Sequence, residues 1–333
     1  MTGTAVTLAL LASLTYGAGT ALSRTAVRQH TASSVALWVQ TVGFVALALA
    51  AVIVRPAPSA EAVLLGVTAG ALAACGVLAF YTAMQNGPIS LVAPVAASGV
   101  AVPVAGGLLL GEQVSRSAFA GLVLVIVGVM VISRSHDGAT PTTGLEATGG
   151  GLDTLASPPG RSQVTPVHDN CKPSSFAHPH RVAVALASTS AAAFGVFYLV
   201  LREAAAAAPS VSSSADVSTL QYPIESAVLV ALAVQGGSLL VTLATASRHT
   251  IRCVRPTRRL VTLAFMIGML DVSGDLALTY AVAVGPIALV GPLGSLDPIV
   301  VVLLAWVFFR EPLTVKRAVG LAACAVGIAL VAA

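Results

Sequence analysis

Long apolar runs alternate with short polar breaks along most of this chain. A helix rises about 1.5 Å per residue, so roughly 20 apolar residues cross a hydrocarbon core of about 30 Å. We therefore predict an all-α integral membrane protein with ten spanning helices at 4–24, 33–54, 61–85, 88–110, 115–133, 182–203, 220–246, 260–284, 286–309 and 314–332. Tight turns at Asn86-Gly87-Pro88 and Gly285-Pro286 separate neighbouring spans, because Gly and Pro end one helix and Pro suits the start of the next.

One segment breaks this pattern. Residues 134–181 are rich in Gly, Ser, Thr and Pro and have few large apolar side chains. Such a composition cannot bury enough apolar surface to offset the entropy of ordering, so it predicts a disordered linker. The linker divides the chain into residues 1–133 and residues 182–333, with five predicted spans each.

The two parts resemble each other in sequence. YTAMQNGPISLVAP (81–94) aligns with TYAVAVGPIALVGP (279–292), and the stretch 108–132 aligns with 307–331. Identical residues pair as Gly87/Gly285, Pro88/Pro286, Leu91/Leu289, Pro94/Pro292, Glu112/Glu311, Gly121/Gly320 and Gly128/Gly327. An odd number of spans per copy places the copies in opposite orientations, so we predict two inverted five-helix repeats, an architecture typical of secondary transporters.

Composition excludes several classes of protein. The chain is 56% hydrophobic and 9% charged, whereas a soluble domain carries about 25% charged residues. Its mean hydropathy is +0.92. The net charge of +4 comes from few residues, and Lys and Arg in such a chain mark topology, so we expect no nucleic-acid partner. The four cysteines form no CxxC motif, and no P-loop, GxSxG or HExxH motif occurs, so we predict neither an enzyme nor a cofactor.

Three acids stand where a lipid-facing helix has none. Asp271 and Asp275 lie four residues apart near the middle of span 260–284, and Asp297 lies near the middle of span 286–309. A charge at the bilayer centre costs about 2.5–3.5 kcal/mol on insertion scales. Desolvation and mutual repulsion favour the neutral acid, so such groups can hold and release a proton or bind a cation. We predict that the three acids, with Glu225 near the start of span seven, form the substrate or proton-coupling site.

Other readings of the polar residues stay open. A protonated aspartic acid can also join two helices by a hydrogen bond, or line a wet vestibule. The candidates for lining the substrate route are Gln40, Gln85, Gln235, Tyr280 and Ser295, and each amide can instead serve as a helix–helix hydrogen bond. Glu112 and Glu311 follow span ends, so we assign them roles at helix starts and interfaces. Gly66 and Gly70 form a GxxxG motif, which predicts close helix packing.

The pattern resembles the drug/metabolite transporter superfamily, and within it the EamA-type ten-span transporters. The resemblance rests on Gly111-Glu112, on the following helix with Gly121 and Gly128, and on the second copy, SLDPIVVVLLAWVFFREPLT. It implies transport, mostly export, of small metabolites. The chain departs from that pattern in its long linker, its extra acids, and Arg310 in place of the second glycine.

Two functions follow as expectations. The first is a proton-coupled exporter of a small cationic or amphipathic metabolite or drug, working by alternating access between the repeats. The second is a transporter of Mg²⁺ or another divalent cation. The partners expected are the small molecule or ion and the lipid bilayer. The sequence leaves monomer and homodimer open, and its Ala-rich composition favours a multi-pass protein of a bacterial inner membrane.

Two criteria for the orientation of the chain in the membrane disagree, so the orientation stays open. Both termini should lie on one side of the membrane, because the number of spans is even. Of the 17 Lys and Arg, 14 fall on the side opposite the termini. The positive-inside rule would then place the termini outside the cell. The family resemblance implies the reverse.

Overall fold

The structure is a computed structural model of the chain. It describes residues 2–27, 32–86, 92, 95–96, 98–112, 114–134, 179–209, 224–246, 258–297, 299–300, 303–304, 307 and 315–332. The predicted linker, 134–181, lies outside the described residues except at its two ends.

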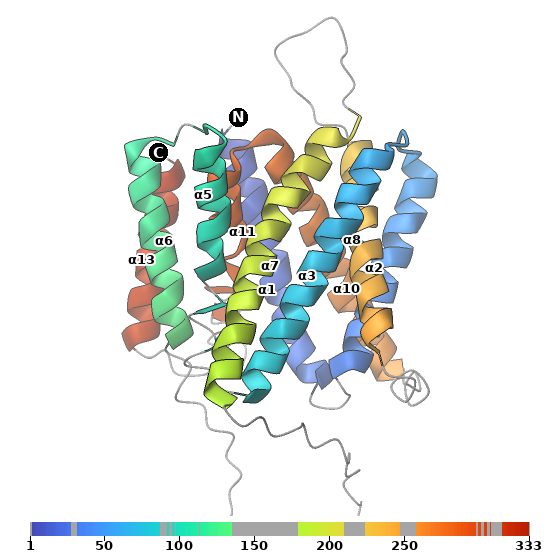
Figure 1. The fold of residues 1–333 in the computed structure, drawn as a ribbon, viewed down its shortest axis with the longest axis horizontal. Helices are drawn as coiled ribbons and strands as arrows, with labels where there is room; N and C mark the ends of the chain where they lie inside the picture. Colours follow the sequence, from blue (N-terminus) through green and yellow to red (C-terminus); the bar gives the residue numbers. More distant parts are fainter. Residues whose placement is uncertain are drawn as a thin grey trace, which may run out of the picture.

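The described residues form a bundle of helices that stand side by side, with both chain ends at the same end of the bundle (Figure 1). The elements are α1 (Thr2–Val27), α2 (Ala32–Val54), α3 (Ala60–Asn86), η1 (Ser98–Val100), α5 (Ala101–Leu109), α6 (Arg116–Arg134), α7 (Pro179–Ala207), α8 (Ile224–Thr245), α10 (Arg258–Val284), α11 (Ile287–Gly294) and α13 (Val315–Ala332). Among the described residues, six helices, α1, α2, α3, α7, α8 and α10, are long and apolar enough to cross a membrane. These helices make the chain a multi-pass membrane protein, as predicted.

The remaining predicted spans correspond to shorter helices. Shorter apolar stretches occupy Ser98–Leu109, Arg116–Gly128 and Ala318–Leu330. The predicted span 286–309 is represented by α11, which ends at Gly294. The span therefore departs from a single continuous helix within its first half.

Small residues bring the helices close together, as the GxxxG motif predicted. On α3, a Cβ added at Gly66 would lie 2.6 Å from the Ala233 Cβ of α8, and one at Gly70 would overlap the Val234 carbonyl. The Ser238 hydroxyl of α8 donates a hydrogen bond to the Gly70 carbonyl oxygen at 2.9 Å. Without side chains at these positions the two backbones approach closely, which drives helix association where lipid is the solvent.

The same principle joins α6 to α13. A Cβ at Gly327 would lie 2.6 Å from the Gly121 carbonyl oxygen, and one at Gly128 would lie 2.8 Å from the Gly320 carbonyl oxygen. The glycines that aligned between the two sequence copies therefore meet each other across this antiparallel pair.

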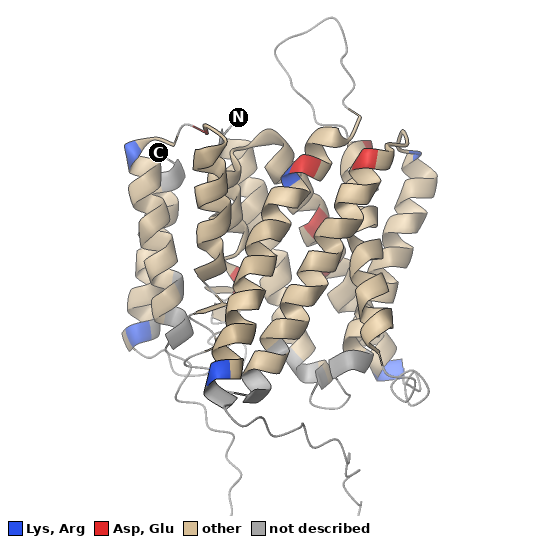
Figure 2. Cartoon of the chain, in the orientation of Figure 1, with Lys and Arg blue, Asp and Glu red and all other residues tan. Residues whose placement is uncertain are grey.

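Polar groups are arranged to suit a lipid surrounding. Figure 2 shows the described Lys and Arg near helix ends, where their charges reach the water at the membrane surface. Many hydroxyls on the helices bond back to a carbonyl one turn earlier, as Thr68, Thr189 and Thr242 do. These hydroxyls therefore carry no unpaired donor into the apolar layer.

Candidate functional site

Glu112 is aimed at the start of α11 by the way α5 ends. Gly111 has φ +80°, and the N–H groups of Gly111 and Glu112 donate to the carbonyls of Leu108 and Gly107 at 3.1 and 3.0 Å. This is the Schellman pattern, which favours glycine at the left-handed position. The Gly-Glu pair is therefore one unit, in which the glycine ends a helix and the glutamate leaves it in a fixed direction.

The Glu112 carboxylate then binds the first turn of α11. The N–H groups of Ile287 and Ala288 donate to its Oε1 and Oε2 at 3.1 and 3.0 Å. An anion is stabilised there by the helix dipole and by otherwise unpaired N–H groups. On α7, Arg202 Nη2 lies 3.6 Å from Glu112 Oε1. The predicted helix-start and interface role of Glu112 is confirmed, but the helix is α11 rather than the adjacent α6, which Ser115 caps. Glu311 lies outside the described residues.

The end of α11 interrupts the predicted ninth span inside the bundle. Pro292 lies within α11, and Ser295 follows as its C-terminal cap, with its N–H 3.2 Å from the Gly291 carbonyl oxygen. Ser295 Oγ donates back to the same carbonyl at 2.9 Å. Ser295 and Leu296 are non-helical and Asp297 is helical again. A broken helix at membrane depth exposes polar backbone and is tolerated where it is packed in protein or lines a cavity.

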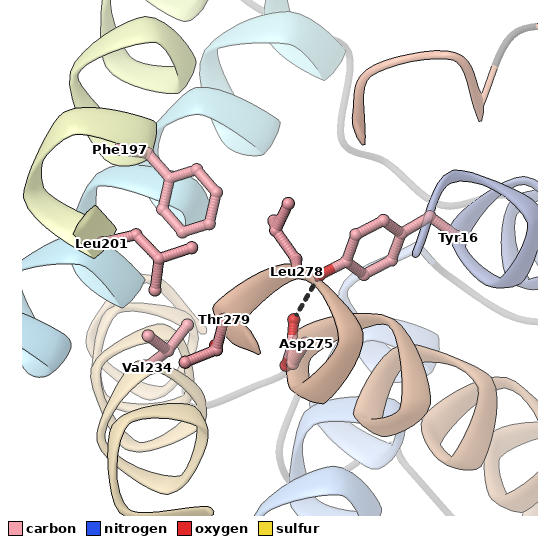
Figure 3. Close-up of a pocket in the computed structure, with 7 residues that line it drawn as sticks. All are labelled: Tyr16, Phe197, Leu201, Val234, Asp275, Leu278 and Thr279. Atoms are coloured by element: carbon pink, nitrogen blue, oxygen red, sulfur yellow. Dashed lines mark hydrogen bonds between the residues drawn. The ribbon is translucent and has the colours of Figure 1, made fainter. Parts of the chain in front are cut away.

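Asp275 receives a hydrogen bond from the first helix of the chain. The Tyr16 hydroxyl of α1 donates to Asp275 Oδ1 at 2.6 Å, and Figure 3 shows the phenol pointing at the carboxylate. The contact requires close packing of the two helices, because a Cβ at Gly274 would lie 2.6 Å from Tyr16 Cε1. A residue 259 positions away in the sequence thus positions the acid.

Asp271 lies one turn before Asp275 and faces α1 as well. A Cβ at Gly19 would lie 3.1 Å from Asp271 Oδ1, so the glycine leaves room for the carboxyl. Both acids of α10 are half-buried and are within electrostatic range of each other. The i, i+4 spacing therefore does place them on one face, as predicted.

The interruption after α11 places Asp297 against α1, the helix that Asp271 and Asp275 also face. A Cβ at Gly17 on α1 would lie 3.0 Å from the Asp297 carbonyl oxygen. On α7, the Tyr198 hydroxyl lies 2.9 Å from Ser295 Oγ. Because Ser295 donates to Gly291, Tyr198 is the donor in this pair. We call Asp271, Asp275 and Asp297, with Tyr16, Tyr198, Gln235 and Ser295, the acid cluster.

Gln235 on α8 completes the cluster. It is 4% exposed and follows Val234, which lines the crevice beside Asp275. Room for its amide comes from Gly43 on α2, where an added Cβ would lie 2.8 Å from Gln235 Nε2. Gln235 Oε1 has no hydrogen-bond partner among the described residues.

A narrow crevice runs along the cluster. It is lined by Tyr16, Phe197, Leu201, Val234, Asp275, Leu278 and Thr279 (Figure 3). It is too narrow to hold a water molecule beside Asp275. Among the described residues the ion pairs are those of Arg202 with Glu112 and with Glu203, and none of the three aspartates takes part in one.

The remaining predicted site residues lie apart from the cluster or are only partly described. Glu225 is exposed in the first turn of α8, so the structure does not bring it to the aspartates. Gln40 is half-buried on α2 and its Oε1 has no partner among the described residues. Tyr280 is half-buried on α10, outside the lining of the crevice. The side chain of Gln85 lies outside the described residues.

Sequence reasoning missed Tyr16 and Tyr198. Neither residue has a local motif, and their partners are 259 and 97 positions away. The sequence similarity between the two parts of the chain does give a signal for Tyr16. If α1 is aligned with α7 so that Gly17 matches Gly195, then Arg24 matches Arg202 and Tyr16 matches Phe194. In this alignment the position is aromatic in both parts of the chain, and only Tyr16 carries a hydroxyl group.

The arrangement defines a helical membrane protein with three aspartates inside it that form no ion pair with any described residue. The sequence profile of the EamA-like transporter family matches residues 3–134 and 181–333. The chain belongs to this family, and it is a membrane transporter of the drug/metabolite type rather than a member of an enzyme family. A solved crystal structure of a protein is similar over 98% of this chain and 96% of its own, with a TM-score of 0.66 at 16% identity, which shows a shared fold. A comparison with curated proteins finds no match.

Proposed function

We propose that this protein is a proton-coupled secondary transporter that exports a small cationic or amphipathic metabolite or drug. The observation that carries the proposal is the acid cluster. Three aspartates lie in apolar helices without a basic partner among the described residues. Each aspartate is tolerated there when it holds a proton or a cation. A cation–proton exchanger has to bind both of these.

Alternating access between two inverted five-helix repeats supplies the mechanism. We propose the first repeat at 1–133 and the second at 182–333, joined by the linker 134–181. The packing supports this proposal, because helix pairs occur in matched sets. α1 packs on α10 and α3 on α7, and α6 packs on α13 as α5 does on α11. The contact of Tyr16 with Asp275 then joins one repeat to the other, so rocking of the repeats would break or remake it.

The interruption after α11 adds a second line of support. Unwound backbone near the middle of a transporter is a usual place for ion and substrate contacts. Here Ser295 and Asp297 lie at the break, and the carbonyl end of α11 carries partial negative charge. A cationic group entering the crevice would meet oxygen atoms of Asp275 and Thr279 on α10 and of Tyr16 on α1. We assign the coupling role to Asp271, Asp275 and Asp297, with Gln235 and Ser295 lining the route, in a bacterial inner membrane.

The test is transport by purified protein in liposomes that enclose a pH-sensitive dye. A gradient of small organic ammonium compounds is imposed on the wild type and on the Asp271→Asn variant, and proton flux is followed. We expect substrate-driven proton flux in the wild type and its loss in the variant. Flux that is undiminished in Asp271→Asn removes Asp271 from the coupling site. Entry of Mg²⁺ without proton movement would replace the proposal with the divalent-cation function.

A further inference from the structure

The short helix α11 begins without a side-chain cap of its own. The residue before it is Pro286, whose ring carries no hydrogen-bond acceptor. The first N–H groups of a helix have no partner inside it. The N–H groups of Leu289 and Val290 both donate to the Pro286 carbonyl oxygen at 3.0 Å. The N–H groups of Ile287 and Ala288 therefore need an acceptor from elsewhere in the chain.

That acceptor is Glu112, which belongs to the other proposed repeat. Its two carboxylate oxygens accept from Ile287 and Ala288 at 3.1 and 3.0 Å. Its side chain is 11% exposed, and its Oε1 lies 3.6 Å from Arg202 Nη2. A hydrogen bond to a carboxylate is charge-assisted and stronger than one between neutral groups. A residue of the first repeat therefore determines where α11 of the second repeat begins.

The helix that leads to Glu112 also packs closely along α11. A Cβ added at Gly107 of α5 would lie 2.8 Å from the Ala288 Cβ. One turn earlier on α5, the Pro103 Cβ would lie 2.7 Å from a Cβ added at Gly291. These contacts run in opposite order along the two helices, so α5 and α11 are antiparallel. Glu112 thus extends a contact that already fixes how α11 lies on the first repeat.

The far end of α11 carries two residues of the acid cluster. Ser295 caps this end and Asp297 follows after one further residue. The Tyr198 hydroxyl of α7 lies 2.9 Å from Ser295 Oγ. Tyr198 and Arg202 are four residues apart, so one face of α7 serves both ends of α11. All eight residues of α11 are buried, and so short a helix is marginal on its own. Its position therefore depends on what holds its two ends.

We propose that Glu112 is a positioning residue for the coupling site. By fixing the first turn of α11, it places Ser295 and Asp297 at the other end of this helix, where we assign them to the substrate route and to coupling. The helix dipole acts in the same sense, because Glu112 stabilises the positive end and the carbonyl end keeps its partial negative charge for a cation. The inference rests on the proposed proton-coupled function and adds to it a residue that acts through α11.

The test is the concentration dependence of proton flux in liposomes, driven by a panel of small organic ammonium compounds. In Glu112→Gln the side chain keeps its size, but its NH₂ end cannot accept from an N–H group. We expect the KM for the ammonium compound to rise about tenfold, the effect of one lost hydrogen bond. The maximal flux per folded protein should stay within about twofold, as when binding alone is weakened. A residue that served stability alone would lower the maximal flux at unchanged KM.

The matched control is Glu203→Gln. Glu203 has the same charge and contacts the same guanidinium, with its Oε1 3.3 Å from Arg202 Nη1. No described hydrogen bond joins its side chain to α11. We expect its KM to stay within about twofold of the wild type. A KM raised equally in Glu112→Gln and Glu203→Gln would assign the effect to charge around Arg202 and overturn the inference.

Hydrogen–deuterium exchange gives a second readout that needs no transport. It is measured on the full-length protein in detergent micelles, for peptides that cover residues 287–297. In Glu112→Gln these peptides should exchange faster than in the wild type, because two N–H groups have lost their charged acceptor. In Glu203→Gln they should exchange as in the wild type. Unchanged exchange in Glu112→Gln would show that Glu112 does not hold α11, and the inference would fail.

Two neighbouring glycines keep the test valid if Glu112→Gln folds poorly. A Cβ at Gly107 would overlap Glu112 Oε2 and lie 2.9 Å from the Ala288 nitrogen. Gly107→Ala therefore presses the carboxylate away from α11 and should raise KM about threefold, the lower part of the range for one hydrogen bond. A Cβ at Gly106 would meet the flexible end of Leu199 at 2.6 Å. Gly106→Ala should leave KM unchanged, and an equal rise in both variants would overturn the inference.

The outcomes separate the inference from the proposed function. If the wild type carries protons and Glu112→Gln has the wild-type KM, the inference is overturned and the transporter remains. If no ammonium compound drives proton flux in the wild type, the proposed function is overturned, and the positioning role falls with it.

Discussion

The contact of α1 with α10 and the contact of α3 with α7 use the same packing but different chemistry. In the first, the Tyr16 ring lies over Gly274, where a Cβ would come within 2.6 Å of it. In the second, the Phe194 ring lies over Gly76, where a Cβ would come within 3.2 Å. In both contacts, the missing side chain of a glycine leaves room for an aromatic ring from the other half of the chain.

The difference lies in the polar atoms added to one of these contacts. The residue after Gly274 is Asp275, which takes the hydrogen bond from Tyr16. The residue after Gly76 is Val77, and Phe194 has no hydroxyl to donate. The proposed repeats thus share their scaffold, whereas Asp271 and Asp275 belong to the α1–α10 contact alone. We infer that ring-on-glycine packing builds the bundle and that substitutions on this scaffold create the site.

The largest effects should come from filling the shared glycine contacts. A Cβ at Gly17 would overlap the Val300 side chain and lie 3.0 Å from the Asp297 carbonyl oxygen. A Cβ at Gly195 would overlap the Val102 side chain and lie 2.9 Å from the Gly99 carbonyl oxygen. We expect Gly17→Ala and Gly195→Ala each to lower the free energy of unfolding by about 3 kcal/mol, as overpacking does. Thermal unfolding in detergent micelles would measure this, and strongly unequal losses would contradict a shared scaffold.

The ring contacts should separate the two regions. Gly274→Ala forces the Tyr16 ring away from its place, whereas Gly76→Ala asks the Phe194 ring to move by a few tenths of an ångström. We expect a loss of about 2 kcal/mol in the first variant and less than about 1 kcal/mol in the second. The same unfolding assay applies. An equal loss of stability in both variants would show that the two ring contacts are equally tight.

Exchanging the aromatic residues tests the chemistry without changing the packing. Tyr16→Phe removes the donor to Asp275, and we expect substrate-driven proton flux to fall about tenfold, the equivalent of about 1.4 kcal/mol. Phe194→Tyr adds a hydroxyl where no acid follows and should leave flux within about twofold. Flux measured in liposomes would decide, and a greater loss in Phe194→Tyr would reverse the assignment of the site.

The smallest effect is expected at a hydrogen bond that belongs to the α3–α7 contact. Ser190 Oγ donates to the Gly76 carbonyl oxygen at 2.8 Å, and the matching position on α1 is Ala12. Ser190→Ala should cost about 1 kcal/mol of stability and leave proton flux unchanged, because this bond serves packing. A clear loss of flux with unchanged stability would place Ser190 in the transport route.

The fold was largely predictable because lipid allows so few solutions. Apolar runs of roughly 20 residues must become helices in order to pair their own backbone groups, and the six long helices follow from this alone. The interruption at Ser295 was not predicted. The helix ends where the Ser295 hydroxyl donates a hydrogen bond back to the Gly291 carbonyl.

The site was predictable in its acids and not in its partners. A carboxyl inside an apolar run is conspicuous because its burial is costly, which marked Asp271, Asp275 and Asp297. Tyr16 is an unremarkable residue of an apolar helix, and the contact that gives it a role depends on how distant helices pack. Glu225 is exposed in the first turn of α8 and lies apart from these aspartates, so its role in coupling stays a prediction.

The most direct test of the central claim compares Asp275 with its counterpart Val77 in one assay. Substrate-driven proton flux is measured in liposomes that contain the wild type, Asp275→Asn or Val77→Asn. The account predicts that Asp275→Asn loses the flux and that Val77→Asn keeps it, because the acid of the α1–α10 contact has no counterpart in the α3–α7 contact. Full coupled flux in Asp275→Asn, with the protein folded, would contradict it.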